Sequence, residues 1–478
     1  MRCLFLTAAV ILVVVLVVGL ETKKRKLLKI RRRKKDLRLM LPSGHPVIDI
    51  CLNFEEIRPC MVQLIQKATK EILLSSFNSS LFSPFYDNQT LNDFLHVAHL
   101  NGLAVKLILN HYQSTYGGDT FESLRNLPYS IYKSRRDDCT LLKHTYCHHH
   151  QKFLCVDAAV ILIGGTETSK DATNKEFNTC DNPYVSCWSD VAVVTSCSPE
   201  LYKFILKTCL SHRYANTDCN SEPYFGDGDN VHSMYVNLIR AAQKYIYIEN
   251  QIFISNDDTE NRLLEEICVR IVDAIEKNTP FKVFIITNDY YTTTDECAQV
   301  RKYTDVHTKN IRNNTRRMCK KLNKNTLDRI DQHLFIGTLQ YKNWPVKLHT
   351  QILVQDGTRM IKGSSNITDR SLSSSPCDKE LTLLFHDQDK ISTFMTKLWN
   401  HRLKTTGVKY GYVTVFDFAK REIGQYKNVT SSALDHVLFS LMRNINIFLP
   451  ANGPCHEGFF EQTCLPKNNC FTPVALSG

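Results

Sequence analysis

Apolar positions along the chain follow two periods, which alternate. Windows of ten or more residues with apolar side chains at helical spacing predict helices, and short runs of apolar or β-branched residues predict strands. In the first part of the chain the pattern predicts helix, strand, helix and strand over 59–69, 71–77, 91–100 and 104–110. The same order recurs over 231–243, 245–254, 262–277 and 281–287. Strands alternating with helices indicate an α/β fold, in which helices cover the sheets.

Each part continues with a strand that bears a histidine. The strand HQKFLCVD begins at His150, and HTQILVQD begins at His349. A second apolar strand and a glycine-containing turn follow each, GGTE from Gly164 and GSSN from Gly363. A strand and a helix then close each part, over 189–195 and 198–210 in the first and 380–386 and 390–403 in the second. About 200 residues separate the two histidines, which indicates duplication of a domain-sized unit.

We therefore expect two similar lobes with accessory segments. A stretch rich in Asn, Asp, Gly and Ser, 218–229, is the natural linker between the lobes. The expected segments are a signal peptide or signal anchor over 1–20, a basic linker over 21–44, the first lobe over 45–216, a linker over 217–230, the second lobe over 231–449, and a C-terminal extension containing Cys and Pro over 450–478.

The positive charge of the chain is concentrated near its start. The formal net charge is +11, but residues 21–38 alone contain eleven Lys or Arg and two acids. The rest of the chain is close to neutral, so a uniformly basic surface for nucleic acid is not indicated. The basic run itself is compatible with a solvated linker, a membrane-surface segment or a processing site.

Two sets of features bear on localisation and disagree. The apolar run 3–20 has a length between that of a signal peptide core and that of a membrane anchor, and the positive charge after it favours a cytosolic position for the rest of the chain. Eighteen cysteines favour an oxidising compartment, as do five Asn-x-Ser/Thr sequons, at Asn78, Asn88, Asn313, Asn366 and Asn428. We expect the secretory pathway, with a lumenal membrane-anchored or secreted glycoprotein containing disulfides. A membrane anchor facing the cytosol is the alternative.

Candidate chemistry lies on the two histidine strands. His150, Lys152 and Asp157 fit the pattern His-x-Lys-x4-Asp, and alternate residues of a strand share a face, so His150 and Lys152 project together. An imidazole can attack phosphorus or donate a proton, while an ammonium neutralises phosphate oxygens. Neighbouring His and Cys over 144–149 show no second ligand pair at metal spacing, so we expect neither a metal nor a cofactor.

The second motif repeats the spacing with one change. His349 and Asp356 stand at the corresponding positions, but Gln351 replaces the lysine. An amide can donate a hydrogen bond to a phosphate oxygen but brings no charge. The loss of one charge-assisted hydrogen bond costs about 1.5–3 kcal/mol, which corresponds to roughly a ten- to hundredfold loss of rate.

These motifs resemble those of the phospholipase D superfamily, whose hallmark is a pair of His-x-Lys-x4-Asp motifs. The run HTQILVQDGTRMIKGSSNITDRSL is similar to its second motif, including the Gly-Ser-x-Asn turn. Residues 247–251 (YIENQ) and 188–190 (WSD) resemble the Glu-Asn-Gln strand and the Trp-x-Asp of the branch that cleaves phosphatidylcholine. The resemblance covers 47–403. It implies a duplicated phospholipase D fold, with two α/β sandwich lobes and the active site at their interface.

The resemblance also implies a mechanism. One motif histidine attacks phosphorus to form a phosphohistidine, the other protonates the leaving alcohol, and water or an acceptor alcohol resolves the intermediate. His150 is the expected nucleophile and His349 the acid–base partner. The remaining expected site residues are Lys152, Asn366, Ser364 and Ser365 around the phosphate, Asp190 and Glu380 as orienting carboxylates, Asp157, Asp356 and Gln351 as motif positions, and Glu249, Asn250 and Gln251 as substrate-binding residues.

We thus expect a phosphodiesterase that hydrolyses or transfers phospholipid head groups at a membrane surface. Two alternatives stay open. One is a lumenal nuclease of the same superfamily, with nucleic acid as its partner. The other is a weakened relative that binds phosphate esters or partner proteins, an interpretation that Gln351 supports. The first-half turn departs as well, because Glu167 stands where many relatives carry Asn.

Overall fold

The computed structural model describes residues 45–110, 119–133, 148–165, 167, 187–210, 228–288, 307–337, 339–341, 344–373 and 378–405. The predicted segments 1–20, 21–44 and 450–478 lie outside these residues, as does most of the predicted linker 217–230. Within the described ranges, no helix is both long enough and apolar enough to span a membrane.

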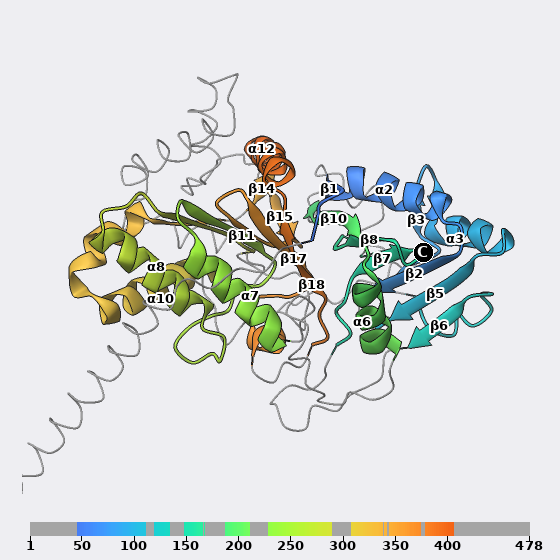
Figure 1. Ribbon diagram of the computed structural model, residues 1–478, viewed down its shortest axis with the longest axis horizontal. Coiled ribbons are helices and arrows are strands. Elements are labelled where there is room, and N and C mark those ends of the chain that lie inside the picture. Colours follow the sequence, from blue (N-terminus) through green and yellow to red (C-terminus); the bar gives the residue numbers. More distant parts are fainter. Residues whose placement is uncertain are drawn as a thin grey trace, which may run out of the picture. The chain divides into compact units, whose positions relative to one another are not determined.

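A seven-stranded sheet forms the first half (Figure 1). Its strands β2, β5 and β6 run parallel to one another, whereas β7, β8, β10 and β1 follow as antiparallel neighbours. In spatial order the strands are β1 (Asp49–Leu52), β10 (Val191–Ser196), β8 (Val160–Ile163), β7 (Phe153–Val156), β2 (Glu71–Ser76), β5 (Ala104–Leu109) and β6 (Ser130–Lys133).

A six-stranded sheet in the second half repeats this order. Strands β11, β12 and β13 are parallel, and β16, β17 and β18 continue as antiparallel neighbours. In spatial order they are β13 (Leu334–Gly337), β12 (Lys282–Ile286), β11 (Tyr245–Asn250), β16 (Gln351–Gln355), β17 (Arg359–Gly363) and β18 (Thr382–His386). The sheets match strand for strand except for β1 at one edge. The predicted duplicated α/β fold is therefore confirmed.

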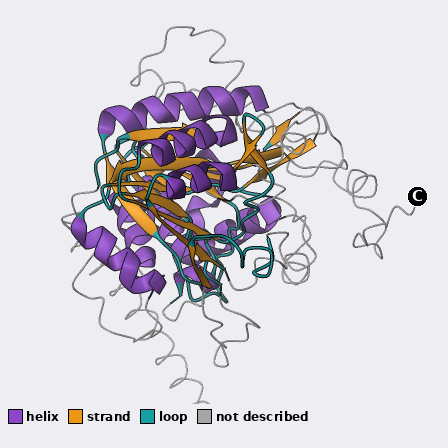
Figure 2. Ribbon diagram, turned by 90° about the vertical axis from the view of Figure 1, so that its right-hand side faces the viewer, coloured by secondary structure: helices purple, strands orange, loops and turns teal. Residues whose placement is uncertain are grey.

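Helices lie on both sides of the strands (Figure 2). Those of the first half are α2 (Asn53–Lys67), α3 (Leu91–Leu100) and α6 (Pro199–Leu210). Those of the second half are α7 (Gly228–Ala241), α8 (Leu263–Glu276), α10 (His307–Leu322), η2 (Lys324–Gln332), α11 (Asp369–Leu372) and α12 (Gln388–Thr405). The short strands are β3 (Pro84–Tyr86), β4 (Gln89–Thr90), β9 (Cys187–Ser189), β14 (Gln340–Tyr341) and β15 (Trp344–Leu348).

Of these helices, α3 has the predicted boundaries, whereas α2 begins earlier than predicted. Helix α3 has the predicted bounds, and Thr90 caps it by accepting a hydrogen bond from the Asp93 backbone N–H. Helix α2 begins six residues before the predicted start at Pro59. The apolar spacing explains this, because Phe54 and Ile57 already face the core and Met61 continues the same stripe. The proline therefore lies inside the helix rather than at its first turn.

The two halves share one hydrophobic core. Phe153 and Val193 of the first sheet belong to the same buried cluster as Tyr247 and Val354 of the second, and Trp399 of α12 completes it. Strand β15 also pairs in parallel with β9, so backbone hydrogen bonds join the halves. The interface between the halves is thus a packed interior, which holds polar groups placed there in fixed positions.

The six cysteines whose side chains the structure describes carry free thiols, so it gives no support to the disulfides expected from the sequence. They nevertheless lie in three pairs whose thiols hydrogen-bond to each other. The pairs are Cys51 with Cys60, Cys155 with Cys197, and Cys268 with Cys319.

Candidate active site

Backbone pairing between the halves positions both motif histidines. The His150 N–H donates to the Lys379 carbonyl (2.9 Å), and the His349 N–H donates to the Ser189 carbonyl (2.8 Å). In both cases a carboxylate residue directly follows the acceptor, Glu380 in one case and Asp190 in the other. The same local pairing therefore places each histidine beside a carboxylate from the opposite half.

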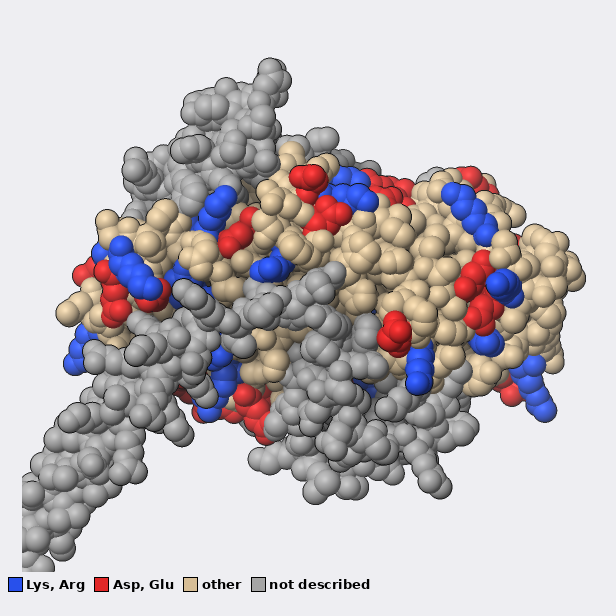
Figure 3. All heavy atoms as spheres, in the orientation of Figure 1, with Lys and Arg blue, Asp and Glu red and all other residues tan. Residues whose placement is uncertain are grey.

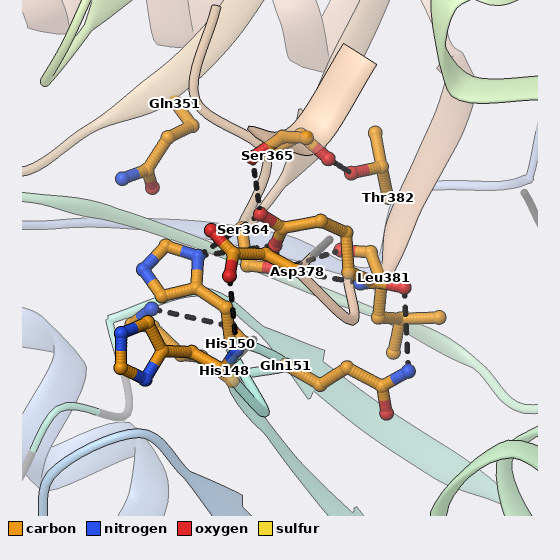
Figure 4. A network of polar contacts seen from close by, with 12 residues as sticks. His148, His150, Gln151, Gln351, Ser364, Ser365, Asp378, Leu381 and Thr382 are labelled. Atoms are coloured by element: carbon orange, nitrogen blue, oxygen red, sulfur yellow. Dashed lines mark hydrogen bonds and ion pairs between the residues drawn. The ribbon is translucent and has the colours of Figure 1, made fainter. Parts of the chain in front are cut away.

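His150 is held by Glu380. Its Nδ1 lies 3.1 Å from both carboxylate oxygens. Ser364 donates its hydroxyl to one of these oxygens (2.5 Å), and Ser371 donates to the other (2.7 Å). Figure 4 shows this network around His150 and Ser364. The carboxylate is thus fixed by two neutral donors, and its bond to Nδ1 directs His150 Nε2 away from it.

His349 is held by Asp190 in the corresponding way. Its Nδ1 lies 3.1 Å from Asp190 Oδ2, and the other carboxylate oxygen lies 3.4 Å from Lys362 Nζ. The Val191 backbone N–H also donates to Asp190 (2.7 Å). The Trp188 ring packs beside the imidazole, with 5.0 Å between ring centroids. Here a buried cation, rather than a pair of hydroxyls, braces the carboxylate.

Glu167 connects the two motifs. Its Oε2 lies 3.4 Å from His349 Nε2 and 3.8 Å from Lys152 Nζ. Lys152 in turn donates to the His150 carbonyl (3.1 Å), and its ammonium lies 5.3 Å from the centre of the Phe77 ring. The lysine of the first motif and the histidine of the second therefore lie on either side of one carboxylate, so the halves share a single site.

Burial and neighbouring charges shift the pKa of His349 in opposite directions. Burial lowers the pKa of its imidazole, while Asp190 and Glu167 oppose that shift. For Asp190, burial acts to raise the pKa, but the attraction of Lys362 and the bond from His349 outweigh it, so this pKa is below its ordinary value. Asp190 is thus an ionised acceptor that keeps one proton on His349 Nδ1, so any second proton that the imidazole carries lies on Nε2, which faces Glu167.

The motif carboxylates Asp157 and Asp356 do not join the site. Each follows the strand that the histidine precedes, which separates it from that histidine by roughly 20 Å of extended chain. Asp157 accepts hydrogen bonds from the backbone N–H groups of 69, 70 and 71 (2.7–3.0 Å). Asp356 accepts from those of 243, 244 and 245 (2.8–2.9 Å). Both anchor the loop before the neighbouring strand, so their expected place among the catalytic residues is not supported.

The turn after the second motif serves mainly to hold other residues. Ser364 is bonded to Glu380, and the Ser365 hydroxyl is bonded to Thr382 (2.7 Å), so both hydroxyls are engaged by neighbouring side chains. Asn366 differs from them, because its Oδ1 is buried and makes no hydrogen bond to any described residue. An amide oxygen is an acceptor, so a phosphate oxygen would have to bond to the Asn366 Nδ2 group instead.

The Glu-Asn-Gln strand, β11, pairs with the second motif strand β16. Glu249 accepts from the Tyr247 hydroxyl (2.6 Å), and Asn250 bonds to the backbone of the turn at 365 and 367 (3.2 and 3.1 Å). Gln351 donates its amide to Gln251 Oε1 (3.4 Å), and in Figure 4 it lies apart from the bonds drawn around His150. Asn250 thus holds the turn, while Glu249 and Gln251 bond to other side chains.

Two charged residues of the site were not among the predicted ones. Glu167 was noted only as a departure from the family pattern, and Lys362 was not singled out. A lysine in the otherwise apolar run before the glycine turn was the available signal, since such a residue is buried only with a partner. Among the described residues, no group of three or more His, Cys, Asp or Glu is arranged to hold a metal ion.

Known proteins support a family assignment. The profile of a family described as "Cardiolipin synthase, PLD-like domain" matches residues 61–181 and 235–402. The chain is 31% identical over 183 residues to phospholipase D C of Dictyostelium discoideum, covering 34% of this chain and 10% of that protein. It is 22% identical over 377 residues to phospholipase D1 of Saccharomyces cerevisiae, covering 58% and 22%. The crystal structure of phosphatidylserine synthase from Haemophilus influenzae superposes with a TM-score of 0.52 at 13% identity, covering 86% of this chain and 100% of that one.

The family profile matches more than half of the chain, and the chain therefore belongs to the phospholipase D superfamily. It spans between a tenth and about a fifth of the length of the two curated relatives. The likeness to the synthase concerns the fold, which agrees with the two matched sheets described above.

Proposed function

We propose that this protein is a phospholipase D-type phosphodiesterase that works through a phosphohistidine. One observation carries the proposal. Two motif histidines are each held at Nδ1 by a carboxylate from the opposite half, and Lys152 lies beside the shared site. Two oriented imidazoles and one cation are the groups that a two-step displacement at phosphorus needs.

In the first step His150 Nε2 attacks phosphorus, and the bond from phosphorus to the leaving oxygen breaks. His349 Nε2 gives its proton to that oxygen, so the alcohol leaves neutral. Water then attacks the phosphohistidine, His349 takes a proton from the water, and the bond from phosphorus to nitrogen breaks. An acceptor alcohol in place of water would transfer the phosphatidyl group instead. Lys152 neutralises phosphate oxygens in both steps.

The surroundings of the two histidines support this division of roles. Glu380 accepts hydrogen bonds from two hydroxyls, and the His150 side chain is 12% exposed, which suits a nucleophile that substrate must reach. His349 is 6% exposed and has carboxylates at both nitrogens, Asp190 at Nδ1 and Glu167 at Nε2. Burial lowers the pKa of His349 below its ordinary value, and the two carboxylates limit that shift, which suits a group that must give its proton to a leaving oxygen.

A phospholipid is the proposed substrate. The similar curated proteins are named phospholipases D, and the similar structure is named a phosphatidylserine synthase. On the face seen in Figure 3, Lys and Arg are interspersed with Asp and Glu among the described residues. That mixture lacks the continuous basic stripe expected of a nucleic-acid channel, which makes a nuclease the second candidate.

The test offers the full-length protein phosphatidylcholine vesicles and single-stranded DNA in parallel, with EDTA present. We expect release of choline, and an acid-labile phosphoryl adduct on His150 after rapid quenching. His150→Ala should abolish both, whereas His96→Ala, which changes an exposed histidine on α3, should leave both unchanged.

Other results would replace the proposal. Cleavage of DNA without choline release would identify the nuclease. No turnover of either substrate, with phosphate-ester binding that survives His150→Ala, would identify a binding protein.

For localisation we propose the secretory pathway. Of the sequons in the described residues, Asn88 and Asn313 are exposed, whereas Asn78 and Asn366 are buried. Three contacting thiol pairs offer sites for disulfides in an oxidising compartment. Mass spectrometry of the protein from its native source should find glycan at Asn88 or Asn313 and none at Asn366. Bare sequons together with free thiols would instead favour the cytosolic face.

A further inference from the structure

The duplication allows the two halves to be compared residue by residue. In the first sheet Phe153 pairs with Ile163, and in the second sheet Ile352 pairs with Lys362. Phe153 and Ile352 each follow the third residue of a motif, so Lys362 occupies the position of Ile163. The first half therefore has lysine at 152 on the motif strand and an apolar residue on the next strand. The second half has the reverse, with an uncharged motif residue and a lysine on β17.

Lys362 is fully buried and lies against the catalytic apparatus. Its Nζ is 3.4 Å from Asp190 Oδ1, and Asp190 Oδ2 is 3.1 Å from His349 Nδ1. Asp190 is its one ion-pair partner among the described residues, and Glu249 lies within electrostatic range. A buried lysine costs folding free energy, so its position beside the carboxylate of an acid–base histidine calls for a functional explanation.

The first half makes room for this lysine. A Cβ atom on Gly164 would overlap Lys362 Cε and lie 2.6 Å from its Nζ. Gly164 also has a φ of +82°, which favours glycine independently. The Lys362 side chain thus crosses from the second half to the glycine turn of the first.

We propose that Lys362 supplies from β17 the positive charge that the second motif lacks at Gln351, and that it acts through Asp190 as a positioning residue for His349. The inference rests on the proposed phosphodiesterase function. Lys362 and Lys152 bracket a row of alternating charges, Lys362, Asp190, His349, Glu167 and Lys152. Without Lys362 the imidazole would lie between two carboxylates with one cation to balance them. His349 would then hold its proton too firmly to release it to the leaving oxygen.

The decisive variants move the charge back to the motif strand. Lys362→Ile should lower kcat/KM for phosphatidylcholine by about ten- to a hundredfold. Gln351→Lys combined with Lys362→Ile recreates the arrangement that the first half already accommodates and should recover at least about tenfold of that loss. Lys362→Gln keeps a hydrogen-bond donor near Asp190 without the charge and should behave as Lys362→Ile does. Lys277→Met removes an exposed lysine that is paired with Asp273 and is the matched control.

A second readout does not depend on turnover. The groups around His349 are Asp190, Glu167, Lys152 and, across the Trp188 ring, Lys347. Removal of the Lys362 charge leaves Asp190 unopposed, so the NMR titration of His349 should move to higher pH by about one unit. If the parent protein turned over no phosphodiester, the proposed function would fail. The NMR titration of His349 would still test whether Lys362 acts on that histidine.

Two results would overturn the inference. One is an unchanged His349 titration in Lys362→Gln, because a purely structural lysine predicts that outcome. The other is a double variant no more active than Lys362→Ile. If Lys362→Ile fails to fold, the folded Lys362→Gln and the double variant decide by the same criteria, and failure of all three to fold would assign Lys362 a structural role and reject the proposal.

Discussion

The two histidines occupy equivalent positions in the two halves, yet their carboxylates are braced differently. Glu380 beside His150 receives two serine hydroxyls. Asp190 beside His349 receives the buried ammonium of Lys362. His349 also has Glu167 at its second nitrogen. Because both histidines are fixed by the same backbone pairing, the fold does not account for these different surroundings.

What differs is the charge that surrounds each imidazole. Hydroxyl donors fix a carboxylate without changing the charge of the site, which leaves His150 beside one anion. Around His349, two anions are each paired with a lysine, so the charge of that imidazole can be adjusted from either side. Duplication thus provides two matching sheets, and a few substitutions on neighbouring strands give the two histidines different charged surroundings.

The largest expected effect is a loss of turnover that would distinguish the proposed nucleophile from the proposed general acid. His150→Ala should reduce turnover by about a thousandfold or more on any phosphodiester, since no covalent intermediate can form. His349→Ala should lose a similar factor on phosphatidylcholine but much less in the first step with a p-nitrophenyl phosphodiester, whose leaving group needs no proton. Stopped-flow detection of a p-nitrophenol burst would check this. A burst in His150→Ala and none in His349→Ala would reverse the assignment.

A second prediction concerns the groups that stabilise the two carboxylates, Lys362 at Asp190 and the serine hydroxyls at Glu380. Asp190→Asn leaves the Lys362 ammonium buried without its ion-pair partner and should lower the free energy of unfolding by about 3–5 kcal/mol. Glu380→Gln leaves two hydroxyls that can still bond to an amide and should cost about 1–2 kcal/mol. Urea unfolding of both variants at neutral pH measures the difference. Equal losses of unfolding free energy would show that the ion pair and the hydroxyl bonds stabilise their carboxylates equally.

The sequence predicted the parts of this site that lie within one motif. His150, Lys152 and His349 follow from local spacing, and Asp190 and Glu380 were named as orienting carboxylates. That each contacts the histidine of the other half depends on the pairing of β15 with β9 and on the isolated β-bridge between His149 and Lys379. Local pattern cannot reveal such pairing. Lys362 was overlooked for a related reason, because its partner lies 172 residues away along the chain.

Asp157 and Asp356 have the same spacing from the two histidines, which suggested a part in the chemistry. In the structure both accept backbone hydrogen bonds at the far end of the strand. Each has a positive φ and anchors three consecutive backbone N–H groups. A spacing that occurs in both halves can therefore reflect the duplicated fold rather than a catalytic role.

A third prediction concerns these aspartates, whose replacement should lower stability equally in the two halves. Asp157→Ala and Asp356→Ala each leave three backbone donors without their acceptor and should lower the free energy of unfolding by about 2–3 kcal/mol. The activity per folded molecule should stay within about twofold, because neither carboxylate touches the reacting groups. A large loss of kcat in folded protein, measured beside circular dichroism, would return these residues to the active site.

The smallest effect concerns acid stability, where the halves differ again. His149 precedes the first motif histidine, and the corresponding residue of the second half is Leu348. Burial lowers the pKa of His149 to about 3, while the unfolded value is about 6.5. The folded state therefore binds fewer protons below pH 6.5, and stability falls as the pH drops from there toward 3. At pH 5 this group alone should cost about 2 kcal/mol relative to neutral pH.

His149→Leu should remove that dependence by giving the first half the residue of the second. Ser75 would lose its bond to the imidazole (2.7 Å) but keep its bond to the Gln151 carbonyl (3.0 Å), so no buried hydroxyl is left unpaired. We expect the variant to match the parent within about 1 kcal/mol at pH 7.5 and to exceed it at pH 5. His96→Leu, on the exposed face of α3, is the control and should leave the pH profile unchanged. If urea midpoints of parent and His149→Leu fell in parallel between pH 7.5 and 5, the buried His149 would not be the source of acid sensitivity, and His148, whose pKa burial lowers to about 4, would be the next group to replace.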